Sequence, residues 1–317
     1  MSHAPRVLVV AGEASGDNLA AGLIRAVRTR RPEVTFAGVA GPRMAEAGCE
    51  RLYDSHRLSV VGLTEVLRHF MDIRRVFKGL LARLRSDPPD LLICVDLPDF
   101  NLRLAHHARK LGIPVVYYVS PQVWAWRRGR LKTIGRRVDH MLVIYPFEEP
   151  FYREAGIRAT FVGHPMVERI PNDPDPVAAR QELGLDPERP VAALLPGSRR
   201  AEVARLAPVL AGAARILHRR YPDLQFVLPV ADATLGAELD PYFPVDEVGV
   251  RRVTDSVGAT AAADVAAVAS GTATLETAVV GTPEVILYKV SPLTYFLARR
   301  LVQVPFIGIV NLVAERE

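Results

Sequence analysis

The stretch LLPGSRRAEV, residues 194–203, marks the point where a buried strand turns into a helix. An apolar run stops at Pro196, and a glycine, a serine and two arginines follow at once. The apolar residues after this turn recur at the spacing of one helix face. They are Val203, Leu206, Leu210, Ala214 and Leu217. A strand, a glycine-bearing turn and a helix in this order are typical of the units that build parallel α/β sheets.

The same order recurs along the rest of the chain. Runs rich in Val, Leu, Ile and Ala, the composition of strands buried on both faces of a sheet, precede glycine- or aspartate-bearing loops and helical patterns. The predicted strands cover residues 6–10, 34–41, 90–95, 114–120, 191–195, 224–230, 264–270 and 284–290. The pattern therefore predicts an α/β fold built from Rossmann-like, doubly wound sheets.

A proline- and aspartate-rich stretch without strand pattern separates the two halves of the chain. We predict an N-terminal domain over residues 1–165, a linker over 166–189 and a C-terminal domain over 190–317. Doubly wound sheets bind ligands outside the carboxyl ends of their strands. Two such domains that face each other predict an enzyme with a cleft between them.

The composition narrows the class of protein. A chain of 317 residues is long enough for two domains with a core in each. Its two cysteines, Cys49 and Cys94, lack metal-ligand spacing, which argues against a disulfide scaffold or a zinc site and fits a reducing cytoplasm. We find no signal-peptide pattern and no run of about 18 apolar residues, so we expect a soluble chain. A net charge of +5 predicts an anionic partner without naming it.

The turn after residue 195 has the residue types of a phosphate-binding site. Gly197 allows a backbone bend close to a ligand, Ser198 offers a hydroxyl and an N-cap, and Arg199 offers a fork of donors. The exposed N–H groups and the dipole of the following helix favour an anion there. The alternative is a tight turn whose arginines face water, and we expect Arg200 to be solvated or to pack along the helix.

The motif SGTATLE, residues 270–276, also follows a predicted strand and opens a helix. The backbone of Gly271 and Thr272 can donate to a diphosphate, and the Glu276 carboxylate can accept both hydroxyls of a ribose. The alternative is a helix capped by Ser270, with a surface glutamate. Together with the turn after residue 195, this motif predicts a nucleotide diphosphate site in the C-terminal domain.

Asp96 opens the motif DLPDFN and directly follows the third predicted strand of the N-terminal half. A carboxylate at a strand's carboxyl end can take a proton from a hydroxyl nucleophile, and partial burial would raise its pKa toward that task. The alternative is a structural bond to a loop N–H. We expect Asp99 and Asn101 to cap the following helix.

The motif AGEASGD follows the first predicted strand. Its glycines, Gly12 and Gly16, lack the spacing of the G-x-G-x-x-G fingerprint, which argues against an NAD or FAD cofactor. We expect the loop to line the cleft or contact an acceptor. Its polar candidates are Glu13, Ser15 and Asp17, and helix capping is the alternative for the last two.

Three stretches that combine basic and apolar residues are candidates for contact with a binding partner. They cover residues 60–85, 124–137 and 291–310. Such stretches pack on a core with one side and face water with the other, or they rest on anionic lipid and receive acyl chains. An aromatic content of 7% and the lack of a nucleic-acid motif argue against nucleic acid as partner.

The motifs AGEASGD, VAGPRM, DLPDFN, YVSPQVWAWR, GHP, LLPGSR, SGTATLE and SPLTYFLARRLV with NLVAERE together resemble those of lipid-A-disaccharide synthases. The resemblance runs from Val7 to the last residue. It implies a metal-independent, inverting glycosyltransferase of the GT-B type, peripheral on the inner face of the cytoplasmic membrane of Gram-negative bacteria. Its members move 2,3-diacylglucosamine from UDP-2,3-diacylglucosamine to the 6-hydroxyl of 2,3-diacylglucosamine 1-phosphate (lipid X), which yields lipid A disaccharide 1-phosphate and UDP.

The resemblance also implies roles for individual residues. Asp96 matches the family's general base, and Arg199 matches the arginine that stabilises the UDP leaving group. The UDP-sugar site would comprise Gly197, Ser198, Arg199, Ser270, Gly271, Thr272, Glu276 and Asn311. The acceptor side of the cleft would comprise Gly12, Glu13 and Ser15. No cofactor is implied, and the family includes homodimers.

Two features depart from the family pattern. Glu315 stands where the family motif N-L-x-A-G-R-E has glycine, and family members continue beyond the position of Glu317, so we expect an incomplete C-terminal domain. Two alternatives stay open. One is a UDP-sugar 2-epimerase of similar architecture, and the other is a non-catalytic peripheral protein that binds lipid.

Overall fold

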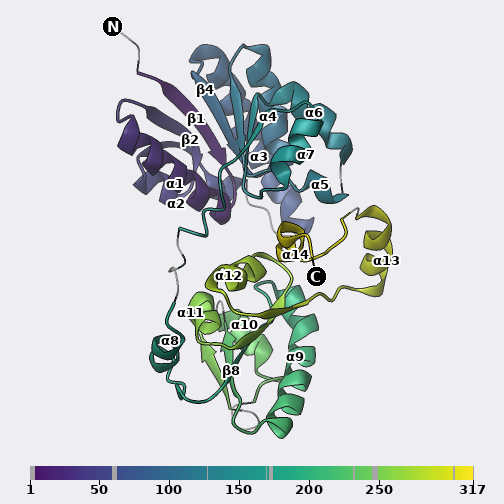
Figure 1. The fold of residues 1–317 in the computed structure, drawn as a ribbon. Coiled ribbons are helices and arrows are strands. Elements are labelled where there is room, and N and C mark those ends of the chain that lie inside the picture. Colours follow the sequence, from purple (N-terminus) through teal and green to yellow (C-terminus); the bar gives the residue numbers. More distant parts are fainter. Residues whose placement is uncertain are drawn as a thin grey trace. The chain divides into compact units, whose positions relative to one another are not determined.

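The computed structural model describes residues 4–58, 63–126, 128–168, 170, 174–230, 233–244, 249–302 and 304–316. The chain divides into two compact units, Met1–Pro165 (unit 1) and Met166–Glu317 (unit 2) (Figure 1). Each unit contains a parallel sheet with helices on both faces, which confirms the predicted α/β class.

Unit 1 holds a seven-stranded parallel sheet in the order β3-β2-β1-β4-β5-β6-β7. Its strands are β1 (Arg6–Ala11), β2 (Thr35–Ala40), β3 (Cys49–Asp54), β4 (Leu91–Val95), β5 (Val115–Tyr118), β6 (His140–Val143) and β7 (Ala159–Phe161). Its α-helices are α1 (Ala14–Arg30), α2 (Pro42–Glu46), α3 (Leu63–Ser86), α4 (Pro98–Lys110), α5 (Val123–Trp126), α6 (Leu131–Arg137) and α7 (Glu148–Glu154). The strand order reverses direction between β1 and β4, so this pair forms the switch point of the sheet.

The core of unit 1 lies in two layers because successive strand residues point to opposite faces of the sheet. Val7 and Val9 pack with α1 and α2, whereas Leu8 and Val10 pack with α3, α4 and α6. From α3, Leu80 is among the side chains buried in this core. The core-packing alternative is therefore confirmed for this part of the basic stretch 60–85. Residues 60–62 of that stretch lie outside the described residues.

Unit 2 holds a five-stranded parallel sheet in the order β10-β9-β8-β11-β12. Its strands are β8 (Val191–Leu195), β9 (Gln225–Pro229), β10 (Val250–Val253), β11 (Val265–Ala269) and β12 (Glu284–Leu287). Its helices are α8 (Pro176–Glu182), α9 (Arg200–Arg220), α10 (Ala233–Leu239), α11 (Ser256–Ala261), α12 (Thr272–Val280), α13 (Pro292–Leu301) and α14 (Ile309–Ala314). The switch point lies between β8 and β11. The predicted apolar face of α9 is confirmed, since it packs on the sheet.

All eight predicted strands are present, but the prediction missed β3, β6, β7 and β10. Three of these are edge strands of their sheets. An edge strand needs no continuous apolar run, and the sequences CERLYD and VRRV show none. The strand before Asp96 is consequently β4, the fourth along the chain rather than the third.

Aspartates tie neighbouring strands together at the amino ends of both sheets. Each stands directly before a strand and accepts a hydrogen bond from the first N–H of the next strand over. The pairs are Asp90 with Arg6 at 2.7 Å, Asp139 with Val115 at 2.8 Å and Asp264 with Val191 at 2.8 Å. The opposite, carboxyl edges of the sheets are thereby left to the loops that carry the candidate site.

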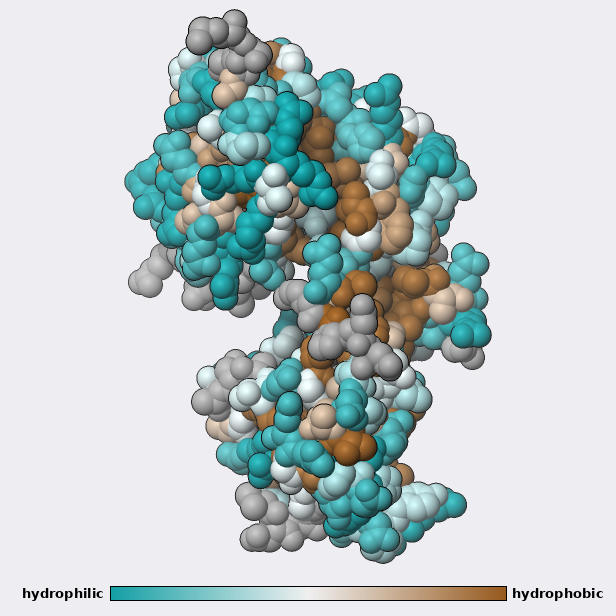
Figure 2. All heavy atoms as spheres, turned by 60° about the vertical axis from the view of Figure 1, so that its left-hand side comes forward, coloured by the Kyte–Doolittle hydropathy of each residue, from teal (hydrophilic) through white to brown (hydrophobic). Residues whose placement is uncertain are grey.

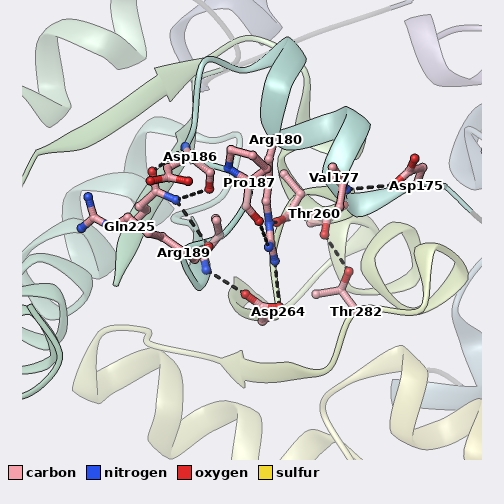
Figure 3. Close-up of polar contacts among 12 residues, drawn as sticks. Asp175, Val177, Arg180, Asp186, Pro187, Arg189, Gln225, Thr260, Asp264 and Thr282 are labelled. Atoms are coloured by element: carbon pink, nitrogen blue, oxygen red, sulfur yellow. Dashed lines mark hydrogen bonds and ion pairs between the residues drawn. The ribbon is translucent and has the colours of Figure 1, made fainter. Parts of the chain in front are cut away.

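The segment 166–189, predicted as a linker, contains the helix α8, and Arg180 of this helix bonds to the body of unit 2 (Figure 3). The buried guanidinium donates to the carbonyls of Ala262 and Pro187, both at 2.9 Å, and pairs with Asp264 at 2.8 Å. The same Asp264 carboxylate holds the amino end of β8. Arg180 therefore joins α8, the loop before β8 and the loop before β11.

Replacing Arg180 by methionine should lower the free energy of unfolding of unit 2 by about 2 kcal/mol. The variant keeps most of the apolar stem but leaves two carbonyls without their donor. Urea unfolding followed by circular dichroism measures the loss. The matched control is Arg205→Met, because Arg205 is exposed and donates to a carbonyl of its own helix. Equal free energies of unfolding of the two variants would contradict the conclusion that the Arg180 bonds hold α8 to the body of unit 2.

Apolar side chains also reach the surface, as one face of the chain shows in Figure 2. On α13 the rings of Tyr295 and Phe296 are more than half exposed, and Arg300 lies 3.9 Å from the Phe296 ring centroid. This pairing of basic and aromatic groups matches the predicted character of residues 291–310. None of the helices within the described ranges combines the length and apolar character of a bilayer span.

Candidate functional site

In unit 1 the candidate residues meet at the switch point. Ala11 of β1 pairs with Val95 of β4, so the loops that follow the two strands lie side by side. A Cβ placed on Gly12 would lie 1.8 Å from the side chain of Leu97, so the Leu97 side chain would have to move to accept any larger residue here. The motifs AGEASGD and DLPDFN thus form one loop pair at the carboxyl edge of the sheet.

Asp96 has a strained backbone that its neighbours hold in place. Asp96 and Leu97 have φ values of 53° and 46°, a region that non-glycine residues seldom occupy and that costs of order 1–3 kcal/mol each. Two side chains donate to the Asp96 carbonyl, Asn101 Nδ2 at 2.7 Å and Tyr117 Oη at 2.5 Å. Burial raises the pKa of the Asp96 carboxyl, and the N–H of Leu97 opposes part of that rise.

The expected helix caps after Asp96 are wrong. The N-cap of α4 is Leu97, and no side chain caps it. Asn101 is instead fully buried, and its amide donates to the carbonyls of Val10 in β1 and Val95 in β4, the two strands of the switch point. Asp99 is exposed and pairs with Arg130 at 2.7 Å.

The polar residues after Gly12 divide into two groups. Glu13, the N-cap of α1, and Ser15, in the first turn of that helix, are exposed. Asp17 is buried and does cap a helix, but the helix is α2 rather than its own. Its carboxylate accepts from the N–H groups of Gly41, Arg43 and Met44 at 2.9, 2.9 and 3.1 Å. This bond set explains why AGEASGD and VAGPRM occur together.

Glu148 is a buried carboxylate that the sequence analysis did not single out. It accepts from Trp124 Nε1 at 3.0 Å and from the N–H groups of Ile144 and Tyr145 at 3.2 and 3.1 Å. These bonds connect the loop after β5 with the turn after β6. Burial raises the pKa of Glu148 to about 7, although the N–H donors favour its charged form. Two of its partners are local, but the bond to Trp124 joins residues 24 positions apart, and the sequence analysis had no rule for that pairing.

In unit 2 the turn after β8 lies beside the turn after β11. Leu195 pairs with Val268, and a Cβ on Gly197 would lie 3.5 Å from that of Ala269. Gly197 has a φ of +104°, which a residue with a side chain rarely adopts. The helix α9 is capped by Arg199 rather than by Ser198, so the predicted serine cap is wrong. Ser198 is exposed.

The two arginines of this turn have different partners. The Arg199 side chain is 82% exposed and pairs with Glu202 at 2.9 Å. Arg200 pairs with Glu238. The Glu202 carboxylate also lies close to Gly197, at 2.8 Å from the place that a Cβ would take. Glu202, which the sequence analysis passed over, therefore occupies the space above the turn.

The residues of SGTATLE lie around the start of α12. The N-cap is Gly271, which overturns the alternative of a Ser270 cap. The Ser270 hydroxyl instead donates to the Ile307 carbonyl at 3.4 Å, Thr272 is exposed, and half-buried Glu276 accepts from Ser256 Oγ at 3.3 Å. The loop and α12 thus bond to segments on both sides of them.

Asn311 lies on α14, which packs against α12. Its side-chain amide donates to the Arg316 carbonyl at 3.0 Å and so spans the end of the helix. Unit 2 therefore brings Gly197, Ser270 and Asn311 into neighbouring elements. The shared cleft between the two domains stays a prediction.

Glu315, which departs from the family motif, has a φ of +55° at the end of α14. Since glycine adopts this conformation without steric cost, Glu315→Gly should stabilise the helix end by about 1 kcal/mol. Slower amide hydrogen exchange over residues 309–316 would report this. Glu315→Ala is the control, because it removes the charge but keeps the Cβ. Equal protection in both variants would contradict a backbone origin.

Comparison with known proteins places these motifs in a family. Residues 7–317 match the family model described as lipid-A-disaccharide synthetase. The lipid-A-disaccharide synthase of Trichlorobacter lovleyi is 52% identical over 98% of this chain and 81% of its own length. That of Myxococcus xanthus is 48% identical over 100% of this chain and 83% of its own length.

Solved structures with a similar fold include two kinds of enzyme. A putative UDP-N-acetylglucosamine 2-epimerase from Listeria monocytogenes superposes with a TM-score of 0.63 at 12% identity, over 99% of this chain and 87% of that one. The glycotransferase of kitacinnamycin gives 0.56 at 17% identity, over 91% and 82%. At such identities the likeness concerns the fold alone, and it confirms the predicted GT-B architecture.

Proposed function

The chain belongs to the lipid-A-disaccharide synthetase family, and on that premise we propose that it moves 2,3-diacylglucosamine from UDP-2,3-diacylglucosamine to the 6-hydroxyl of 2,3-diacylglucosamine 1-phosphate. The products are lipid A disaccharide 1-phosphate and UDP. The observation that carries the proposal is identity near 50% with lipid-A-disaccharide synthases over nearly the whole chain. The chain is a glycosyltransferase, and the epimerase alternative is not favoured.

In our proposal Asp96 is the general base. Its carboxylate takes the proton of the acceptor 6-hydroxyl while that oxygen attacks C1 of the donor sugar from the face opposite UDP. The C1–O bond to UDP breaks in the same displacement, and its electron pair leaves with the diphosphate. Inversion requires only this one carboxylate. A pKa raised by burial supports the role, because a stronger base accepts the proton more readily.

The leaving diphosphate would be held in unit 2. The N–H groups at the start of α9 and the guanidinium of Arg199 would offset the charge that develops on UDP. Arg199 pairs with Glu202 at an exposed site, and such pairs are worth about 1 kcal/mol or less, so the arginine can exchange Glu202 for phosphate oxygens. Ser198 would add a hydroxyl at the same turn.

The remaining site residues would hold the nucleoside and the acceptor. Around UDP we assign diphosphate contacts to Ser270, Gly271 and Thr272, the ribose to Glu276, and a polar contact to Asn311. On the acceptor side we assign Gly12, Glu13 and Ser15. The exposure of Glu13 and Ser15 beside Asp96 supports this assignment.

Because both substrates carry acyl chains, we propose that the reaction takes place on the inner face of the cytoplasmic membrane, with the enzyme bound peripherally. Support comes from α3, where Arg74, Arg75 and Lys78 are exposed while the opposite face packs on the core. Homodimerisation stays a prediction.

Product analysis tests the proposal. Incubating the chain with both monosaccharide lipids should yield a tetraacyl disaccharide phosphate by mass spectrometry. Incubation with UDP-2,3-diacylglucosamine alone should leave it unchanged. Conversion of that substrate alone into its 2-epimer would identify an epimerase. Normal binding to anionic vesicles without any product would identify a non-catalytic lipid-binding protein.

A further inference from the structure

A hollow of about 420 Å³ lies between α4 and α6 of unit 1, away from the residues assigned to the transfer reaction. Its lining consists of His106, Arg109, Lys110, Thr133, Arg136 and Arg137, and no acidic residue is among them. Both helices run from the carboxyl edge of the sheet back to its amino edge, and these basic residues lie in or near their last turns. The hollow therefore lies toward the edge opposite Asp96.

The charge around this hollow is only partly compensated. Four permanent cations line it, and Asp139 pairs with one of them, Arg109. Each helix end contributes about half a negative charge through its dipole, which removes about one more. About two positive charges remain. Cations at helix ends are common, but here they exceed what the two dipoles offset.

The donors around the hollow are partly fixed in advance. Arg137 donates to the Leu102 carbonyl at 3.1 Å, and Asp139 holds Arg109, so both guanidinium groups have defined positions. Lys110 and Arg136 are exposed, and no hydrogen bond or ion pair engages them in the described part of the chain. The lining therefore combines two guanidinium groups held by hydrogen bonds or an ion pair with two exposed cations.

The positively charged groups of the lining affect the pKa of His106. The pKa of His106 is lowered from its ordinary value by burial first, and then by Lys110, Arg137 and His107. An anion bound in the hollow would oppose this effect and favour the imidazolium. His106 is therefore a built-in reporter of occupancy.

We propose that the hollow between α4 and α6 binds a phosphate group that carries two negative charges. Arginine forks match phosphate oxygens in geometry, and a phosphate monoester carries about 1.5 to 2 negative charges near neutral pH, which balances the excess. The Thr133 hydroxyl adds a neutral donor. A lipid phosphate and a soluble phosphorylated compound share this chemistry. The proposal does not depend on the transfer reaction.

The test uses inorganic phosphate and the full chain. Titration followed by NMR should raise the pKa of His106, with chloride at equal ionic strength as the reference. The double variant Lys110→Gln/Arg136→Gln should bind phosphate roughly tenfold more weakly, since two exposed charge contacts are lost. Arg205→Gln is the matched control on a helix of unit 2. An unchanged His106 pKa, or equal phosphate affinity in the double variant and the wild type, would overturn the proposal.

Binding to lipid vesicles tests whether the phosphate group belongs to a lipid headgroup or to a soluble compound. Vesicles of phosphatidylcholine with phosphatidic acid are compared with phosphatidylcholine alone. Weaker binding of the double variant to the acidic vesicles would assign a lipid headgroup to the hollow. Unchanged vesicle binding, together with the loss of inorganic phosphate affinity, would assign a soluble phosphorylated ligand. Turnover of the two lipid substrates dispersed in detergent should stay the same in either case, because neither residue belongs to the proposed transfer machinery.

Discussion

Asp96→Asn should lower kcat by about 10²–10⁴-fold while UDP binding persists, because the amide cannot accept the acceptor proton. The replacement has nearly the same shape, and the bonds that Asn101 and Tyr117 donate go to the backbone carbonyl rather than to the side chain. The loop should therefore keep its strained conformation. Quenched-flow or steady-state product formation measures the change, and calorimetry measures UDP affinity.

The pH dependence supplies a second readout for Asp96. The carboxylate acts as a base only when ionised, so activity should fall as the pH drops through its raised pKa, and asparagine should abolish that limb. The contribution of Asp96 to the free energy of unfolding should depend on pH in the opposite direction to activity. The folded state binds the Asp96 proton more tightly than the unfolded state, so this group's contribution to stability is lost as the pH rises through the folded pKa. At neutral pH the variant should be at least as stable as the wild type.

The matched control for this experiment is Asp99→Asn. Asp99 lies three residues further along, is exposed and pairs with Arg130. Its replacement should leave turnover within about twofold of the wild type, as expected for exposed pairs worth under 1 kcal/mol. Normal turnover in Asp96→Asn would show that another group is the base.

Sequence patterns predicted that the candidate motifs of each unit lie at the carboxyl edge of its own sheet, because local rules govern that placement. An apolar strand followed at once by a polar or glycine-bearing motif places that motif at the carboxyl edge of a parallel sheet. Asp96 and Gly197 both follow such strands, and both lie at switch points. The periodicity after residue 200 likewise identified the buried face of α9.

The residues that support the site escaped prediction because their partners are distant in sequence. Asp17 caps a helix that begins 25 residues later, at Pro42. Asn101 looked like a helix cap by its type and position, yet tertiary carbonyls compete for its amide. Glu148 bonds Trp124, which lies 24 residues earlier in the chain. Capping rules describe local competition, so they fail where a buried network offers a polar side chain better partners.

Arg199→Ala should lower kcat by about 10²–10³-fold, the effect of removing one donor from developing negative charge. Arg199 is the N-cap residue of α9, but its side chain makes no capping hydrogen bond and is 82% exposed. Removing that side chain should therefore change the free energy of unfolding little. A large fall in turnover without a change in unfolding would then report on chemistry. Arg199→Lys should recover only part of the rate, because a single ammonium cannot form the two-pronged contact of a guanidinium.

Arg200→Ala is the control for Arg199, since it removes the neighbouring arginine, which pairs with Glu238. It should retain turnover within about threefold, as expected for an exposed pair.

Glu202→Gln tests whether Arg199 exchanges Glu202 for the phosphate oxygens of UDP. The wild type must free Arg199 from Glu202 before it can bind phosphate, so the neutral variant should bind UDP more tightly, by up to about fivefold. Weaker UDP binding in Glu202→Gln would instead mean that Glu202 positions Arg199 for the diphosphate, and equal losses in the two arginine variants would remove Arg199 from the mechanism.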